Sequence, residues 1–505
     1  MKKLTGLDML FLAMESSKSP THAGVVQIFD LPSKGGAAYV DKVYKAFLQA
    51  RPAEPFNCYP DIRALNRPCW RVAEDYDSNY HVRRIALPAP GTDAQLMTLV
   101  GHLYPGLLDR RLPLWECYLI EGLQGGRFAV FLKLHHAYGD GMSGARAFYE
   151  TLNHKPKAAG ITPMWAYEKP AKKKKPKVEI KTIAKLEKAF SGAVNQISSL
   201  SGASREVLQI GAQALGISPA PKGRKPTFSA HTSSLHQPFH SGARNFAFGS
   251  IPLQKVKTIA RKYDATVNDV VMTICDHAMV QYLSEKGEAP QQALTGMMAV
   301  STRAKGDQSS SNAAAVAVTG LGEPTADIVT RLQQVNRETG KLKQDISGKS
   351  PESLFYSNLV LTVTTQLSMG IPGLNERLPP AANLFVSNIP GMTDQPLYLG
   401  SALMSGVYTA PIVQAGLPVN VTLGSYHGQL CFGFGAASEV MPDTAHYASL
   451  CFEAFKALAE KTLGKKTPGA TRKKSGAAAA QGGGKSTGRK RAPAVPSARR
   501  KKAAK

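Results

Sequence analysis

The chain has 505 residues with 62 Lys or Arg and 36 Asp or Glu, so its formal net charge is +26 at pH 7. Residues 461–505 carry 15 Lys or Arg and no acidic residue, which leaves only +11 of that charge on residues 1–460. This length predicts two domains with appendages rather than one core.

The apolar and cysteine patterns exclude several classes of protein. No run of about eighteen apolar residues occurs, so no membrane-spanning helix is expected. The short apolar stretch behind Lys2 and Lys3 is interrupted by acidic residues and does not resemble a signal peptide. Six scattered cysteines without a Cys-x-x-Cys pair disfavour disulfides and thiolate zinc sites, and they suit a reducing cytosol. We expect a cytoplasmic protein without a metal or redox cofactor.

Local signals in the first part of the chain predict alternating helices and strands. Thr5 followed by Asp8 predicts a capped helix over residues 4–15. His22 follows a break in this helical pattern, and we expect a turn or packing histidine because no metal-ligand set is near it. Trp115, beside Pro113-Leu114, is expected to anchor the core. Apolar patterns further predict a helix at about 39–49 and strands at 23–29, 80–87, 117–120 and 128–134.

The segment His135-His136-Ala-Tyr-Gly-Asp140-Gly141 lies between the last of these strands and a predicted helix over 142–152. Successive side chains at a strand end point to opposite faces, so only one histidine can face a given cleft. A neutral imidazole can take a proton from a hydroxyl group. No serine with a Gly-x-Ser-x-Gly signature accompanies this segment, and Ser143 lacks the flanking pattern. The pattern therefore favours a general base that activates an incoming acceptor over a covalent acyl-enzyme.

The composition changes after this motif. Residues 153–177 contain four prolines and a lysine run, which predicts a linker. Apolar residues at helical spacing over 183–200 predict a basic amphipathic helix, which either packs across the two domains or rests on an anionic membrane or lipid-body surface. His236 and His240 are four residues apart, but Pro238 and the absence of an acidic or thiol partner disfavour a metal site.

The second half repeats the alternation of strands and helices. Asn268 and Asp269 stand at the start of a predicted helix that extends to about residue 282, where side-chain caps are expected. Residues 427–428 are a His-Gly turn between two apolar alternating runs, which predicts a hairpin. The other expected elements are a helix at 253–263 and strands at 246–251 and 297–303.

Several of these segments together resemble the bacterial wax ester synthase/acyl-CoA:diacylglycerol acyltransferase (WS/DGAT) family of CoA-dependent acyltransferases. The resemblance runs from about residue 4 to about residue 460. In one departure, Gly139, preceded by Tyr138, replaces the family's usual apolar residue before the Asp. The motifs that carry the resemblance are Leu-Asp-x-x-Phe-Leu from Leu7, Pro-x-His-x-Gly from Pro20, Pro-Leu-Trp from Pro113, His-His-x-x-x-Asp-Gly from His135, Asn268-Asp269 and Ser-Asn-x-Pro-Gly from Ser387.

The resemblance implies a two-domain α/β fold of the chloramphenicol acetyltransferase type, with an active-site tunnel between the domains. The corresponding bounds are an N-terminal acyltransferase domain at 1–153, a basic linker with the amphipathic helix at 154–226, a C-terminal acyltransferase domain at 227–463 and a disordered basic tail at 464–505.

The resemblance also assigns roles. His136 would be the general base, with His135, Asp140 and Gly141 as structural support. Asn268 would steady the active site or the oxyanion, and Arg303 is a candidate partner for Asp140. The substrates would be long-chain acyl-CoA and a fatty alcohol or a diacylglycerol, giving wax ester or triacylglycerol. The protein would lie peripherally on the inner membrane face or on lipid inclusions.

Two alternatives remain open from the sequence. One is a condensation-type enzyme whose acyl donor is bound to a carrier protein. The other is a protein that coats lipid inclusions or tethers them to DNA through its tail, because a chain segment of this charge attracts polyanions nonspecifically. The tail contains no aromatic residue for base stacking, and it could equally be a merely solvating segment.

Overall fold

The computed structural model describes residues 2–33, 35–62, 68–138, 148–157, 160–168, 230–301, 314–347, 361, 365, 380–389 and 393–464. Met1–Gly464 forms one compact unit. Asp140, Gly141, Arg303, the predicted amphipathic helix over 183–200 and the basic tail all fall outside the described residues. Within the described part of the chain, no helix has the length and apolar character needed to cross a bilayer.

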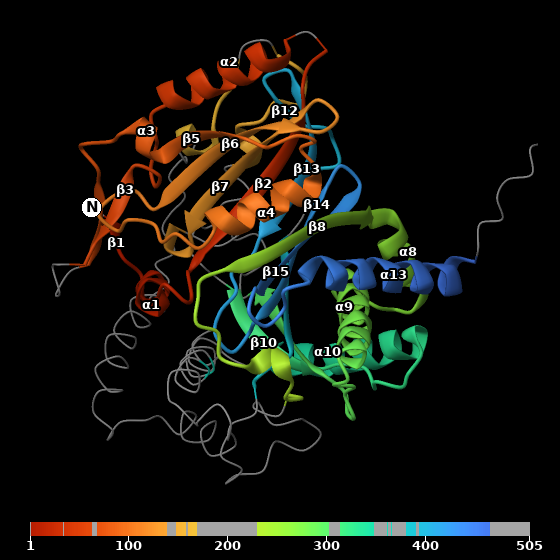
Figure 1. Ribbon diagram of the computed structural model, residues 1–505. Helices are drawn as coiled ribbons and strands as arrows, with labels where there is room; N and C mark the ends of the chain where they lie inside the picture. Colours follow the sequence, from red (N-terminus) through yellow and green to blue (C-terminus); the bar gives the residue numbers. More distant parts are fainter. Residues whose placement is uncertain are drawn as a thin grey trace, which may run out of the picture. The chain divides into compact units, whose positions relative to one another are not determined.

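The first large sheet contains six strands in the order β12-β13-β2-β7-β6-β5 (Figure 1). Helices α2 (Gly36–Gln49) and α4 (Asp93–Leu103) belong to the same half of the chain. The strands are β2 (His22–Asp30), β5 (Val82–Ala86), β6 (Trp115–Leu123), β7 (Arg127–His135), β12 (Tyr398–Leu399) and β13 (Ala402–Ala410).

The strand expected over residues 80–87 is shorter than predicted. Residues Ser78–His81 form the helical turn α3 instead, because the side chain of Asp77 accepts a hydrogen bond from the backbone N–H of Asn79 and caps it.

A small three-stranded sheet, in the order β1-β4-β3, lies next to helix α1 (Gly6–Met14) in the first half. Its strands are β1 (Lys2–Lys3), β3 (Cys58–Asp61) and β4 (Cys69–Val72). The predicted cap of α1 is confirmed: the Thr5 hydroxyl accepts from the N–H of Asp8, and the Asp8 carboxylate accepts from the N–H of Thr5.

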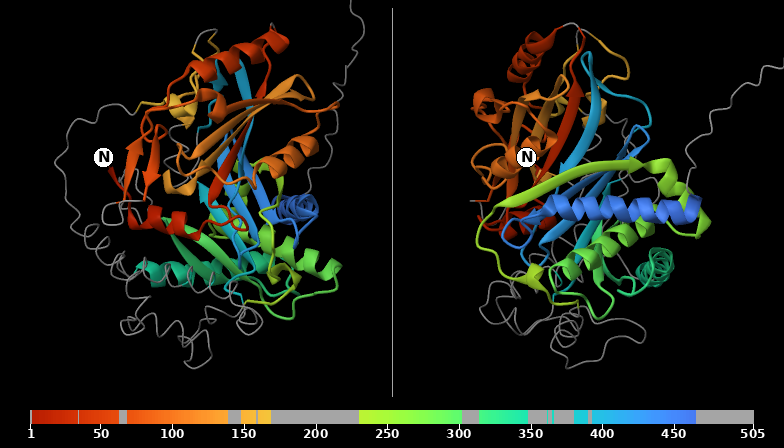
Figure 2. Two further views of the ribbon diagram at one scale, coloured as in Figure 1. Left: turned by 60° about the vertical axis from the view of Figure 1, so that its left-hand side comes forward. Right: turned by 45° about the vertical axis from the view of Figure 1, so that its right-hand side comes forward.

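The second large sheet has the order β10-β9-β11-β14-β15-β8. Figure 2 shows its green, cyan and blue strands from two further directions. His427 and Gly428 have φ values of 47° and 74° in the turn between β14 and β15, so the predicted hairpin is confirmed. The strands are β8 (Arg244–Pro252), β9 (Thr295–Ser301), β10 (Ala314–Gly320), β11 (Leu384–Ile389), β14 (Val419–Tyr426) and β15 (Gln429–Ala437), and the helices are α8 (Leu253–Lys262), α9 (Val267–Glu285), α10 (Ile328–Ser347) and α13 (Thr444–Leu463).

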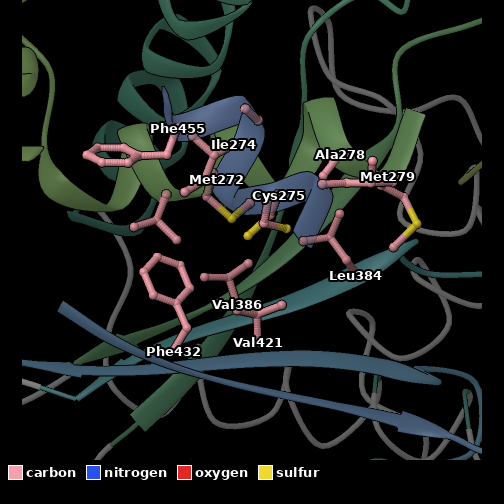
Figure 3. Packing of buried hydrophobic residues seen from close by; sticks show 14 of the residues in the cluster. Met272, Ile274, Cys275, Ala278, Met279, Leu384, Val386, Val421, Phe432 and Phe455 are labelled. Carbon is pink, nitrogen blue, oxygen red and sulfur yellow. The ribbon is translucent and has the colours of Figure 1, made fainter. Parts of the chain in front are cut away.

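Helix α9 is the centre of the second core. Its apolar side chains pack on Leu384, Val386, Val421 and Phe432 of the sheet (Figure 3). Single turns of 3-10 helix complete the described elements at His136–Tyr138, Met164–Ala166 and Ser234–His236.

The two halves of the chain share a sheet. Strand β13 comes from the second half, yet it pairs antiparallel with β2 from Leu403 opposite Asp30 to Ala410 opposite Gly24. The expected domain bounds follow the sequence and assign residues 398–410 to the C-terminal domain. In the structure these residues belong to the sheet that the first half forms. The first sheet is therefore complete only when both halves are present.

Gly433 of β15 marks the place where the second sheet meets β13 of the first. A β-carbon on Gly433 would lie 1.8 Å from the backbone oxygen of Thr409, and backbone atoms cannot move aside as a flexible side chain can. A β-carbon on Gly424 of the neighbouring strand β14 would meet no atom within 4 Å.

We predict that Gly433→Ala lowers the free energy of unfolding by about 3 kcal/mol, because the added methyl forces the sheets apart. Gly424→Ala is the matched control and should change it by less than about 0.5 kcal/mol. Urea unfolding followed by near-ultraviolet circular dichroism measures both. Equal stability of the two variants would show that the sheets do not meet at Gly433.

Candidate active site

The two histidines stand where strand β7 ends. His135 is the last residue of β7 and pairs in register with His22, the first residue of β2. His136 begins a 3-10 turn, and its backbone N–H donates to the backbone oxygen of Thr21 at 3.0 Å. Residues 20–22 of the Pro-x-His motif therefore lie beside the histidine pair.

The imidazole of His135 is buried and hydrogen-bonded at both nitrogens. Its Nδ1 accepts from the backbone N–H of Ala137 at 3.1 Å, and its Nε2 lies 3.0 Å from the hydroxyl oxygen of Thr21. That hydroxyl donates its own hydrogen to the carbonyl of Phe11 at 3.0 Å, so it accepts from His135. These contacts fix the neutral ring with the proton on Nε2.

A buried carboxylate lies next to His135. One oxygen of Glu15 is 3.5 Å from His135 Nε2, and the other is 3.1 Å from a guanidinium nitrogen of Arg110. Burial alone would raise the pKa of Glu15, but the hydrogen bond from His135, together with the hydrogen bond and charge of Arg110, lowers it to about 2. The carboxylate therefore stays ionised while its side chain is only 1% exposed.

His136 is half-buried, and its ring stacks on Phe11 of α1 with centroids 4.2 Å apart and planes 26° apart. Phe11 belongs to the Leu-Asp-x-x-Phe-Leu motif, and its carbonyl also receives the hydroxyl of Thr21. The two N-terminal motifs thus contact both histidines, one through a ring face and the other through hydrogen bonds.

Tyr138, part of the departure from the family pattern, is a packing residue. Its hydroxyl donates to the carbonyl of Cys58 at 2.6 Å and accepts from the N–H of Leu114 at 2.6 Å. Its ring stacks on Trp70 with centroids 5.1 Å apart. Tyr138 therefore ties the histidine segment to the Pro-Leu-Trp motif and to the small sheet. Gly139 lies outside the described residues.

The structural roles expected for Trp115 and His22 are confirmed. Trp115 is fully buried, donates from its indole N–H to the carbonyl of Phe56 at 2.8 Å and stacks on Trp165. His22 is fully buried, with Nε2 2.6 Å from the carbonyl of Tyr104. Burial, followed by the charge of Lys133, lowers the pKa of His22 to about 3, so the ring is neutral near pH 7.

Asn268 is not the cap of its helix. Thr266 caps α9: its hydroxyl accepts a hydrogen bond from the Asp269 N–H, and the Asp269 carboxylate accepts one from the Thr266 N–H. The sequence signal for this cap is the spacing Thr-x-x-Asp. Asn268 is left to accept a 2.7 Å hydrogen bond from the side-chain amide of Asn388. The Asn-Asp and Ser-Asn-x-Pro-Gly motifs therefore meet through this pair.

No cluster of three or more His, Cys, Asp or Glu in the described ranges is arranged to hold a metal. The ring of His236 lies 3.2 Å from the carbonyl of Ala382 and packs in the second half of the chain. Asp140, Gly141 and Arg303 fall in gaps of the described ranges, so their expected roles stay predictions.

We predict that Glu15→Gln destabilises the protein by about 2 to 3 kcal/mol at pH 7. Folding lowers the pKa of Glu15, so the stabilisation from its carboxylate is complete above about pH 4.5 and is lost as pH falls towards 2. The difference in free energy of unfolding between wild type and variant should therefore become smaller as pH falls from 6 to 3. Denaturant unfolding at each pH measures this difference, with the exposed Glu74→Gln as control. A difference independent of pH contradicts the assignment.

Comparison with known proteins gives one consistent result. Residues 4–271 match the wax ester synthase/diacylglycerol acyltransferase catalytic domain, and residues 310–459 match the WS/DGAT C-terminal domain. The chain is 32% identical over 462 residues to the Probable diacyglycerol O-acyltransferase Tgs4 of Mycobacterium tuberculosis, covering 90% of this chain and 96% of that one.

Solved structures agree on the fold. The wax ester synthase/diacylglycerol acyltransferase from Marinobacter aquaeolei VT8 superposes with a TM-score of 0.70 at 27% identity, covering 92% of this chain and all of that one. The first condensation domain of the calcium-dependent antibiotic synthetase has a TM-score of 0.54 at 14% identity, covering 91% of this chain and 96% of that one, a likeness of fold alone. The predicted two-domain α/β class is thus confirmed. The chain belongs to the wax ester synthase/diacylglycerol acyltransferase family of the CoA-dependent acyltransferase superfamily.

Proposed function

We propose that this WS/DGAT-type O-acyltransferase moves a long-chain acyl group from acyl-CoA to a fatty alcohol, a diacylglycerol or both. Family membership supports the donor and acceptor classes. The observation that carries the assignment of the base is the engagement of both ring nitrogens of His135 by Ala137 and Thr21. His135 cannot take a substrate proton at Nδ1 without losing a buried backbone hydrogen bond, so the role of base falls to His136.

The proposed reaction needs only one protein group that accepts and then returns a proton. His136 takes the proton of the acceptor hydroxyl while its oxygen attacks the thioester carbonyl, so that a C–O bond forms. The C–S bond breaks, and His136 returns the proton to the departing thiolate to give free CoA. His135, Asp140 and Gly141 support the geometry. A tunnel between the domains, as in the predicted fold, would hold both substrates together, so that they react as one molecule.

The Asn268–Asn388 pair is our candidate for steadying the oxyanion. Asn388 uses one amide hydrogen to hold the Asn268 oxygen, which aims the Asn268 amide group away from that contact. A donor held in place before the reaction stabilises the charge that develops on the thioester oxygen. Asn388 is thus the positioning residue and Asn268 the donor.

The proposed activity is tested with purified protein, palmitoyl-CoA and either hexadecanol or dioleoylglycerol, by measuring free thiol and neutral-lipid product. Ester from either acceptor is expected, and His136→Ala should lower the turnover number by about 10³-fold or more, since a general base contributes about 10²- to 10⁴-fold. The exposed His102→Ala is the control and should retain full activity. Full activity of His136→Ala would overturn the mechanism.

We predict that Asn388→Ala lowers the turnover number by about tenfold and Asn268→Ala by about 10²-fold, as for loss of one oxyanion donor. The Michaelis constant for acyl-CoA should change little. Because Asn388 acts through Asn268, the double variant should be no slower than Asn268→Ala alone. Multiplying losses in the double variant would show that the two residues act independently.

The carrier-protein alternative differs in its donor. The turnover rate is measured with acyl-CoA and with acyl-carrier protein that carry the same acyl group at equal concentration. Faster turnover with the carrier protein would show that the donor is not acyl-CoA. The predicted amphipathic helix over 183–200 and the basic tail lie outside the described residues. Contact of that helix with a membrane or lipid inclusion, and polyanion binding by the tail, therefore stay proposals.

A further inference from the structure

Helix α8 has a cationic outer face. Leu253, Val256, Ile259 and Ala260 are buried against the second core, which places every charged side chain of the helix outside. The helix contains no acidic residue. Its exposed side chains are Gln254, Lys255, Lys257, Thr258, Arg261 and Lys262.

The charge of this face is uncompensated. In the described part of the chain, no carboxylate lies within ion-pair distance of Lys255, Lys257 or Arg261. The neighbouring helix α13 carries the exposed Glu453 and Glu460 as well as the exposed Lys456 and Lys461, and Lys461 lies 3.6 Å from a carboxylate oxygen of Asp327. Asp264 follows α8. The net positive charge is therefore concentrated on α8.

The α8 face ends beside an exposed apolar side chain. Lys262 donates to the carbonyl of Thr462 at 2.6 Å and so holds the end of α8 to the end of α13 (Figure 1). The next residue, Leu463, is 42% exposed. Three cations without a carboxylate partner, on a helix whose last residue is held to the residue before Leu463, suit a surface with phosphate groups above a hydrocarbon layer.

This face is remote from the histidine pair. Strand β8 begins at Arg244, whose guanidinium donates to the carbonyl of Lys18, close to the Pro-x-His motif. It ends at Pro252, directly before α8, and eight residue steps of strand span about 26 Å. The cations of α8 therefore do not belong to the acyl-transfer site.

We propose that the outer face of α8, formed by Lys255, Lys257 and Arg261, docks the enzyme on an anionic phospholipid surface. The choice of lipid over nucleic acid rests on the proposed function, whose acceptors are apolar and gather in lipid phases. It rests also on the face itself, which offers Leu463 nearby and no aromatic residue for base stacking.

The test uses the full chain and co-sedimentation with vesicles of phosphatidylcholine alone or with about a third of phosphatidylglycerol. The variant Lys255→Gln/Lys257→Gln/Arg261→Gln should bind anionic vesicles at least about tenfold more weakly than wild type, because each cation near an anionic leaflet contributes several-fold to binding. Lys262 is retained because it holds α13. The charge-matched control, Lys45→Gln/Arg51→Gln/Lys155→Gln, removes three exposed cations elsewhere and should change binding less than about twofold.

Three outcomes would overturn the proposal. Equal binding of the two triple variants would show that charge alone matters and not this face. Equal binding of wild type to neutral vesicles would exclude headgroup charge. A larger loss of binding to duplex DNA than to vesicles would assign the face to nucleic acid. With an acceptor dispersed in detergent, the α8 variant should turn over as fast as wild type, because no vesicle has to be bound. A wild-type protein that is inactive in this assay would count against the proposed function and not against the docking surface.

Discussion

Strand β2 is hydrogen-bonded along both edges, to β7 on one side and to β13 on the other. The pairing with β7 places Thr21 and His22 beside His135, so the position of the histidine pair depends on backbone register rather than on any single side chain. The pairing with β13 joins the second half of the chain to the same strand. One strand therefore takes part both in positioning the histidine pair and in joining the two halves.

The interior around this strand contains ionised groups, and each has a partner. Glu15 contacts Arg110 and His135, and the buried Lys133 of β7 lies 3.0 Å from Glu116 and donates to the carbonyl of Gly106 at 2.7 Å. Removing one member of such a pair leaves an uncompensated buried charge, which costs more than the pair contributes. Charges of this kind give the segment around the histidines a single arrangement.

Local signals in the sequence were sufficient for what is local in the structure. The Thr5 cap, the strand before the histidines and the hairpin at 427–428 each depend on residues a few positions apart, and each was predicted. The short helix at Ser78–His81 was missed because a weak Asp77 cap competed with an apolar pattern. The order of the strands was beyond sequence reasoning, since β13 and β2 are about 380 residues apart in the chain and their pairing leaves no periodic signal.

The candidate site also combines local features, which the sequence predicts, with long-range contacts, which it does not. The histidine motif can be found from its residues and their place at a strand end. The contacts of Glu15, Thr21 and Phe11 with that motif, and the hydrogen bond between Asn268 and Asn388, join segments far apart in sequence. The family motifs include Phe11, Thr21, Asn268 and Asn388 but indicate no contact between them, and Glu15 lies outside these motifs. Asn268 shows the difference, because its place at a helix start suggested a cap and its actual contact is a residue 120 positions away.

The shared sheet also bears on how the chain is made. During synthesis β2 emerges first, and its second neighbour, β13, is not available until the ribosome has passed residue 410. Until then one edge of β2 presents unpaired backbone groups, the kind of edge that pairs with other chains. The first sheet cannot be completed before residue 410 has been made, and its completion needs a long-range pairing between the two halves of the chain.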